Sequence, residues 1–396
     1  MLGDGGTNTD VSAPSSTAIN LGTGRTAVAV SSGGYHTCAI LDNGDLKCWG
    51  WDSNGQLGNG GSNTNTNAPS STAINLGTGR TAVAVSTGAY HTCAILDNGD
   101  LKCWGWGARG QLGHGATTSL NSPPSTAINL GTGRTAVAVT AGADHTCAIL
   151  DNGDLKCWGS DSNGQLGDGG SNANRNSPPS APINLGTGRT AIAVSATDDT
   201  TCAILDNGDL KCWGDDDDGQ LGDGGSTNTD TNAPSSTAIN LGTGRTAVAV
   251  AAGDDHTCAI LDNGDVKCWG GDDNGRLGNG GSNTNLNAPS STAINLGTGR
   301  TAVAVSAGYG HTCVILDNGD AKCWGWNGYG QLGVGDTFTR TSPVAVSGSN
   351  TWNSSTGAPT GMVSVSGATC AISPSLPTGM SLTSGTCTIT GTPTVT

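Results

Sequence analysis

One fifteen-residue block that recurs along the chain constrains the fold more than any other feature. The segment 36–50 reads HTCAILDNGDLKCWG, and near-copies follow at intervals of 54 to 56 residues. Six copies are present, and their first cysteines are Cys38, Cys93, Cys147, Cys202, Cys258 and Cys313. A period of this length, with several short strands in each unit, is typical of solenoids and propellers.

Each repeat unit contains four candidate strands. In the first full unit they span 46–51, 72–76, 81–86 and 91–96, with Gly-, Asn- and Ser-rich turns between them. Four strands per repeat is the content of one propeller blade. The chain has 66 Gly, all its acidic residues are Asp, and strong helix formers are scarce. This composition favours short strands joined by many turns over a helical enzyme.

The repeat resembles that of a known family. The pattern H-T-x-A-[IL]-x(2)-[DN]-G, followed by W-G and G-Q-L-G-x-G, is similar to the repeat of RCC1, the regulator of chromosome condensation, over residues 2 to about 346. The resemblance implies a β-propeller, usually of seven blades. It implies the function less well, because the family includes nucleotide-exchange factors, photoreceptors and inhibitors of secreted enzymes. Two cysteines in every repeat depart from the intracellular members and suggest a cysteine-paired microbial surface type.

The six copies predict a six-bladed propeller over residues 1–346. The N-terminal part supplies candidate strands at 17–21, 26–30 and 36–41, and we expect 321–326 to complete that blade and close the ring. The candidate strand 343–346 is then one too many, and Met1 stands inside a GQLGDGG-like motif. The alternative is a truncated chain, with a seventh blade and a signal peptide upstream.

The tail, residues 347–396, differs in kind from the repeats. Its segment ATCAISPSLPTGMSLTSGTCTITGTPTVT is similar to the immunoglobulin-like domains of large surface proteins, which carry a PxLPxGLxL…GTISGTPT signature. About 50 residues are too few for a complete sandwich. We therefore expect a partial Ig-like segment, and a chain that is monomeric or part of a larger multidomain protein.

The cysteines predict a disulfide framework. A three-residue DNG loop fits a type I turn with a G1 bulge, which places Cys38 opposite Cys48 in a non-hydrogen-bonded pair, with Cα atoms about 4.5 Å apart. Such a framework forms in an oxidising compartment, so we expect an extracellular or cell-surface protein. The other predicted pairs are Cys93 with Cys103, Cys147 with Cys157, Cys202 with Cys212, Cys258 with Cys268, Cys313 with Cys323, and Cys370 with Cys387.

Zinc binding is the alternative reading of the cysteines. His36, Cys38 and Cys48 would share one face of a blade and could supply three zinc ligands. Against this, the fourth copy has Thr200 in place of the histidine and keeps both cysteines. Reduced, buried thiols are a third alternative.

Two loops vary between copies: the one before HTC and the one after CWG. Both lie at the end of the hairpin opposite the DNG turn, so both fall on one face of the propeller, where loops commonly carry binding. Copies six, one and two are rich in aromatic residues, while copies three to five are rich in aspartate. If copy six closes against copy one, the aromatic loops are contiguous. The candidate binding residues are Tyr35, Trp51, Tyr90, Trp106, Arg109, Tyr309, Trp326 and Tyr329.

The face suggests an aromatic platform beside an acidic arc. The platform suits a protein or glycan ligand. The arc could take Ca²⁺ through Asp215, Asp216, Asp217 and Asp218, although this run lacks the downstream Glu of an EF-hand and coincides with an ordinary turn of the repeat. No cofactor is otherwise expected. The alternative is sequence drift in tolerant loops.

Charge and composition exclude several classes of function. The net charge of −15 disfavours nucleic-acid partners, and no apolar run is long enough for membrane insertion. No carboxylate pair or nucleophile constellation stands apart from the repeat, so we expect no enzyme. The sequence therefore predicts a non-catalytic secreted or cell-surface binding and adhesion scaffold. An intracellular RCC1-type regulator, similar to a guanine-nucleotide exchange factor, and a purely structural spacer are the alternatives.

Overall fold

A computed structural model describes residues 2–6, 10–61, 63–225, 229–281 and 283–348, together with the backbone of two further strands in the tail. The described part is almost entirely β-structure, and its helical content is one 3-10 turn, η1 (Asp273–Gly275). No helix in the described ranges is long and apolar enough to cross a membrane.

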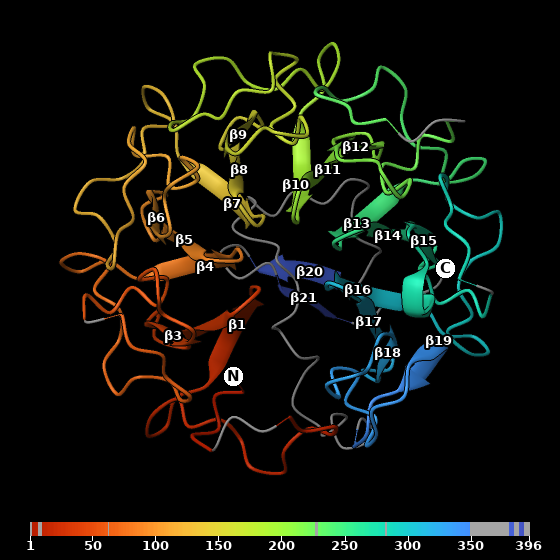
Figure 1. The fold of residues 1–396 in the computed structure, drawn as a ribbon, viewed down its shortest axis with the longest axis horizontal. Helices are drawn as coiled ribbons and strands as arrows, with labels where there is room; N and C mark the ends of the chain where they lie inside the picture. The colour runs from red at the N-terminus through yellow and green to blue at the C-terminus, as the bar shows by residue number, and fades with distance from the viewer. Residues whose placement is uncertain are drawn as a thin grey trace.

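Six antiparallel sheets are arranged in a ring (Figure 1). The first three sheets contain β1 (Ala27–Ser32), β2 (His36–Leu41) and β3 (Leu46–Gly50); β4 (Ala82–Thr87), β5 (His91–Leu96) and β6 (Leu101–Gly105); and β7 (Ala136–Ala141), β8 (His145–Leu150) and β9 (Leu155–Gly159). The last three contain β10 (Ala191–Ala196), β11 (Thr200–Leu205) and β12 (Leu210–Gly214); β13 (Ala247–Ala252), β14 (His256–Leu261) and β15 (Val266–Gly270); and β16 (Ala302–Ala307), β17 (His311–Leu316), β18 (Ala321–Gly325) and β19 (Arg340–Ala345). We number these sheets as blades 1 to 6.

The DNG turn sets the register of each blade. In blade 1, Leu41 N donates to Asp45 O at 2.8 Å and Gly44 N donates to Leu41 O at 2.8 Å. Gly44 has φ of 80°, a conformation that glycine adopts at little cost. The resulting register pairs His36 with Gly50 and Cys38 with Cys48. The predicted hairpin register is therefore confirmed.

The buried core lies between neighbouring blades. Ile40 and Leu46 of blade 1 pack with Leu96 and Trp104 of blade 2, and equivalent clusters occupy the next four interfaces. The GQLG motif locks each interface, because Trp104 Nε1 donates to Gln56 O at 3.1 Å. The following glycine lies directly against the same indole, where any Cβ would overlap it. These contacts explain why the motif recurs.

The prediction of four strands per blade is wrong for most blades. Residues 72–76 and 17–21 form no strand. Among the described residues, the backbone of the connecting segment bonds to β3 at two places, where Thr66 bridges Gly50 and Ile74 N donates to Leu46 O at 2.9 Å. The reason is local chemistry, because a proline lacks the ladder N–H and Ser70 Oγ accepts from Thr72 N in a turn. Within the described ranges only blade 6 has a fourth strand, β19, which contains most of the candidate strand 343–346.

The predicted closure of the ring is also wrong. β18 pairs with β17 and β19, and β1 pairs only with β2, so 321–326 does not complete the N-terminal blade. Blades 6 and 1 meet through loops instead, where Gly335 N donates to Ser12 O at 2.6 Å. Among the described residues no apolar cluster fills this interface. As a result Val30 of β1 is 45% exposed, whereas its counterpart Val85 is 8% exposed.

The tail contributes one hairpin to the described structure. β20 (Met380–Thr383) pairs antiparallel with β21 (Thr388–Gly391). The rest of the predicted Ig-like segment, including Cys370 and Cys387, lies outside the described residues. The domain boundary at residues 346 and 347 stays a prediction.

Candidate binding face

Six of the seven predicted cysteine pairs are disulfides in the structure. Their Cα atoms are 4.0 to 4.1 Å apart, slightly closer than the separation expected for a non-hydrogen-bonded pair. The bridges join Cys38 with Cys48, Cys93 with Cys103, Cys147 with Cys157, Cys202 with Cys212, Cys258 with Cys268, and Cys313 with Cys323.

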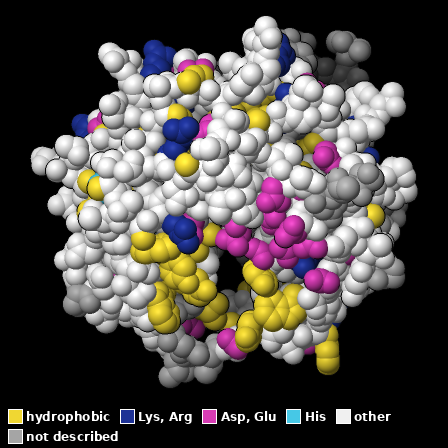
Figure 2. Space-filling view, turned by 45° about the horizontal axis from the view of Figure 1, so that its top comes forward, with side chains coloured by type: hydrophobic (Ala, Val, Ile, Leu, Met, Phe, Trp, Pro, Cys, Tyr) yellow, Lys and Arg dark blue, Asp and Glu magenta, His cyan; other side chains and the backbone are white. Residues whose placement is uncertain are grey.

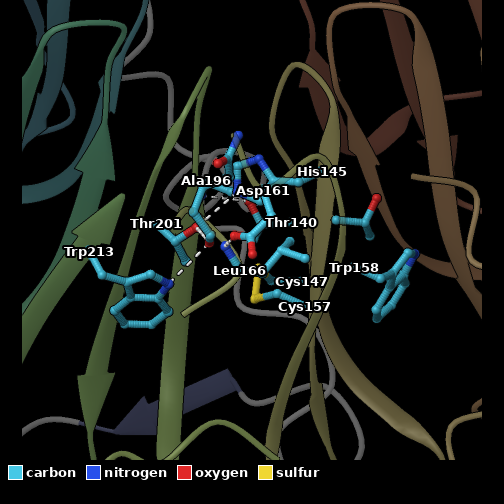
Figure 3. Close-up of a disulfide and its surroundings, with 12 residues drawn as sticks. Thr140, His145, Cys147, Cys157, Trp158, Asp161, Leu166, Ala196, Thr201 and Trp213 are labelled. Atoms are coloured by element: carbon cyan, nitrogen blue, oxygen red, sulfur yellow. Dashed lines mark hydrogen bonds between the residues drawn. A yellow bond between two sulfur atoms is a disulfide. The ribbon is translucent and has the colours of Figure 1, made fainter. Parts of the chain in front are cut away.

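The disulfides belong to the packed framework of the ring. Ten of the twelve bridged cysteines join apolar clusters between blades, and Cys323, which ends the last bridge, is also buried. Figure 3 shows one bridge, between Cys147 and Cys157, beside Trp158. Since no cysteine of the described part is free, the zinc alternative and the alternative of reduced thiols are wrong for these residues.

The histidine of the repeat joins neighbouring blades. His145 Nε2 lies 2.8 Å from Thr201 Oγ1, and Thr201 Oγ1 donates to Gln165 O at 2.9 Å (Figure 3). Because the hydroxyl hydrogen is used on the carbonyl, the imidazole must be the donor through Nε2. Burial lowers the pKa of His145 to about 4. The histidine is therefore neutral and structural.

The variable loops of one blade are tied together at the end opposite the DNG turn. Trp51 N donates to Tyr35 O at 3.0 Å, and Trp106 N donates to Tyr90 O at 2.9 Å. The backbone turns out of the sheet at the preceding glycines, Gly50 and Gly105, which have φ of 122° and 101°. Both variable loops therefore lie on one face, as the hairpin argument predicts.

Blades 1 and 2 bring four of the candidate aromatic residues into one cleft. Tyr35 and Tyr90 stack with ring centroids 4.9 Å apart. Trp51 lies 6.3 Å from Tyr35, and Trp106 meets Tyr90 edge-on at 6.0 Å. With Ser53 and Asn54 these rings line an open cleft of about 490 Å³, which we call the aromatic cleft.

The aromatic residues of blade 6 form a separate group. Trp326 and Tyr329 meet edge-on at 5.1 Å, and Tyr309 is 72% exposed. No ring contact within the described ranges joins them to the aromatic cleft, and blades 6 and 1 share no apolar cluster there. The expectation that the aromatic loops of copies six, one and two are contiguous stays a prediction.

Aspartates from blades 3, 4 and 5 continue the face beyond the cleft. From here on, the name acidic arc is kept for Asp144, Asp198, Asp199, Asp254 and Asp255, which precede β8, β11 and β14. It does not include Asp215, Asp216, Asp217 and Asp218. Figure 2 shows acidic and hydrophobic side chains in adjacent sectors around a central opening.

Partial burial and mutual repulsion raise the pKa values of several carboxyl groups in the acidic arc. Burial, followed by the charges of Asp198 and Asp215, raises the pKa of Asp199 to about 7. Burial and the neighbouring Asp255 likewise raise the pKa of Asp254 to about 7. Burial raises the pKa of Asp144 to about 6, against the opposing effect of the exposed Arg109. Burial, together with neighbouring negative charges, therefore opposes the ionisation of Asp144, Asp199 and Asp254.

Arg276 is a residue of this face that sequence reasoning missed. It replaces the glutamine of GQLG in one copy only, and that departure was the available signal. Its Nη1 lies 2.7 Å from Asp255 Oδ2, and a second nitrogen lies 3.3 Å from Asp273 Oδ2. Its side chain is buried, so this guanidinium compensates the blade 5 end of the arc.

The four predicted calcium ligands make different contacts in the structure. Asp216 is buried and accepts from Leu221 N at 3.0 Å, and Asp218 accepts from Asn285 Nδ2 at 2.7 Å. Asp215 and Asp217 instead approach Asp230, with carboxylate oxygens within 4.8 Å of one another. Sequence reasoning missed Asp230, and the four consecutive aspartates do not form one ligand set.

Comparison with known proteins places the chain in a family. The RCC1-like domain matches residues 1–371. The chain belongs to the RCC1-like domain family. The ultraviolet-B receptor UVR8 of Arabidopsis thaliana is 32% identical over 325 residues, which are 81% of this chain and 70% of the receptor.

Two solved structures that align with the chain share its fold. Human WBSCR16 aligns with a TM-score of 0.72 at 22% identity, over 86% of this chain and 90% of that protein. Yeast RCC1 (Prp20), solved with Kap60 bound, aligns with a TM-score of 0.70 at 20% identity, over 81% and 75%. These likenesses agree with the all-β propeller predicted from the repeat.

Proposed function

We propose that this chain is a non-catalytic scaffold that binds a protein ligand through the variable loops of one propeller face. One observation carries the proposal: two neighbouring blades gather Tyr35, Trp51, Tyr90 and Trp106 into a single open cleft. The repeat does not need these residues for packing, because other copies place different residues at the same positions. Exposed aromatic side chains in a pocket are typical anchors of recognition.

The family supports a protein ligand ahead of a glycan. Yeast RCC1, which shares the fold, has been solved with another protein, Kap60, bound. A rigid ring with variable loops on one face suits such recognition.

We place the scaffold outside the cell or on its surface, where adhesion is the corresponding role. The support is the set of six disulfides, since such bonds persist in oxidising compartments. Protein from an oxidising host should show fourteen cysteines that alkylate only after reduction, measured by intact mass. Freely alkylated thiols would contradict this location and favour the hypothesis of an intracellular RCC1-type regulator.

The binding role is tested by selection on two libraries. The wild-type chain is offered a random-peptide display library and an array of glycans, in parallel with the double variant Trp51→Ala/Trp106→Ala. Phe338→Ala is the matched control, because it removes an exposed aromatic ring that is not among the candidate binding residues. We expect the wild type and the control to enrich common peptides that the double variant does not retain. Enrichment of no ligand, or equal enrichment by all three, would reject the proposed function.

A further inference from the structure

The aromatic cleft and the acidic arc adjoin each other. Asp144, the first member of the arc, stands in the blade that follows Tyr90, and its charge reaches that side chain. A hydrogen bond with Tyr35, burial, and the charges of Tyr35 and Asp144 together raise the pKa of Tyr90 to about 12. The loops that carry these residues are in contact, because Gly88 of the Tyr90 loop lies against Gly142 O and Ala143 N donates to Thr197 O at 3.0 Å. From Asp144 the carboxylates continue through Asp198 to Asp254, each close enough to affect the next. A ligand seated in the cleft would therefore have a line of negative charge beside it.

The cleft offers ring surface more than hydrogen bonds. Trp51 Nε1 donates to Ser53 Oγ, and Asn54 Nδ2 donates to the same oxygen at 3.2 Å. Asn54 N is also occupied, by Gln56 Oε1 at 3.0 Å. A sugar is usually held by such polar groups as well as by stacking. Asn54 Oδ1 and Trp106 Nε1 keep hydrogen-bonding capacity, but most of the open lining is aromatic surface, and ring faces attract cations.

The cations of this chain are already engaged elsewhere. The chain has 16 Lys and Arg, all within the described ranges. Each repeat lysine is largely buried and donates to a backbone carbonyl, as Lys102 Nζ does to Leu76 O at 3.0 Å. The arginines of the GTGR turns pair with aspartates, as Arg80 does with Asp97 at 3.2 Å. Among the described residues Arg109 alone has neither kind of contact. A second copy of the chain therefore cannot supply a row of free cations.

We propose that the aromatic cleft and the acidic arc together bind a basic segment of a partner protein. One arginine or lysine side chain enters the cleft between Trp51 and Trp106, and the following basic residues lie along Asp144, Asp198 and Asp254. This inference rests on the proposed function and specifies the chemistry of its ligand. Charge complementarity of this kind accelerates association and weakens with salt.

The test uses the whole chain and defined probes. The first is a synthetic peptide with three arginines spaced by Gly-Ser pairs. The second has citrulline at each arginine position, which keeps the shape and removes the charge. The third is a neutral oligosaccharide, chitotriose. Binding is followed by calorimetry and by tryptophan fluorescence. We expect the arginine peptide to bind at least about tenfold more tightly than the citrulline peptide.

Matched variants separate the cleft from the arc. Trp106→Leu removes a wall of the cleft, and Asp199→Asn removes one charge of the arc. Phe338→Leu is the aromatic control, because this exposed ring is not among the candidate binding residues. We expect affinity for the arginine peptide to fall about tenfold in Trp106→Leu, about threefold in Asp199→Asn, and not at all in Phe338→Leu. Thermal unfolding of each variant establishes that it is folded.

The outcomes distinguish this inference from the proposed function. Equal binding of the arginine and citrulline peptides would overturn the inference. So would binding of chitotriose that depends on Trp106 while the arginine peptide fails to bind. In both cases a cleft that still selects ligands from the libraries would leave the proposed function standing. The inference would also be overturned if Trp106→Leu bound the arginine peptide with the same affinity as the wild type.

Discussion

Two tryptophans that stand two residues apart in blade 1 have opposite environments. Trp49 is 3% exposed and lies in the packed framework, whereas Trp51 is 43% exposed at the aromatic cleft. The same holds in blade 2, where Trp104 donates to Gln56 O and Trp106 meets Tyr90 at the open end. Hydrophobicity cannot separate the two classes. Recurrence does, because the first tryptophan is present in every copy and the second in three.

The largest expected effect comes from replacing the buried tryptophan of such a pair, which belongs to the packed framework between blades. Trp158→Ala should lower the free energy of unfolding by about 3–5 kcal/mol, because it opens a cavity between blades and removes one of the two donors to Gln111 O, leaving that of Thr146 Oγ1. Trp106→Ala, at the half-exposed position, should lower it by about 1 kcal/mol or less. Denaturant titration of both variants measures the difference. Equal losses would mean that the aromatic cleft is part of the core.

Removing one disulfide should have the next largest effect. The double variant Cys147→Ala/Cys157→Ala should lose about 2–3 kcal/mol, since the bridge closes only a short loop in the unfolded chain. The far-UV circular dichroism spectrum should stay that of the wild type, because the clusters on both sides of the blade remain. Loss of that spectrum would show that a single bridge holds the whole ring.

Blade 4 offers a third test, because it lacks the histidine of the framework. In other copies the histidine ring lies against a glycine, as His145 does against Gly142. Blade 4 has Thr200 in place of the histidine and Thr197 in place of the glycine. We therefore expect Thr200→His alone to destabilise the fold, because Thr197 occupies the space of the ring. The double variant Thr197→Gly/Thr200→His should recover stability by forming a bond to Thr257, worth about 1 kcal/mol.

The gain of the double variant should depend on pH. Burial lowers the pKa of the equivalent His256 to about 3. The folded state then holds the histidine neutral while the unfolded chain protonates it near pH 6.5, so the gain is present above about pH 6.5 and falls as the pH drops below it. Thermal unfolding at about pH 8 and about pH 5 measures this change. A gain that is equal at both values would contradict the neutral, buried histidine.

Short-range geometry was predictable from the sequence, and long-range closure was not. The DNG turn and the ten-residue spacing determine the pairing of Cys38 with Cys48, because turn type sets register. The same reasoning places Tyr35 and Trp51 at one end of a hairpin. Ring closure depends instead on whether two distant blades pack, and Val30 carries no signal in the sequence that it would be exposed. Arg276 was detectable only as a departure from the repeat, and its pairing with Asp255 needed the structure.

The smallest expected effect separates the acidic arc from the framework. Since the pKa of Asp199 is raised to about 7 in the folded state, folding favours its protonated form, and stability decreases as the pH rises from about 4 through about 7. Asp199→Asn keeps an oxygen that can accept from Gln165 Nε2 and removes the charge. We expect a small rise in the thermal midpoint at about pH 8 and none below about pH 4. Asp100→Asn, at a DNG turn on the opposite face, is the control and should show no such dependence. If the thermal midpoint of Asp199→Asn stays above that of the wild type at acid pH, the stabilisation does not come from removing a negative charge. Electrostatic repulsion would then not distinguish the acidic arc from the packed framework.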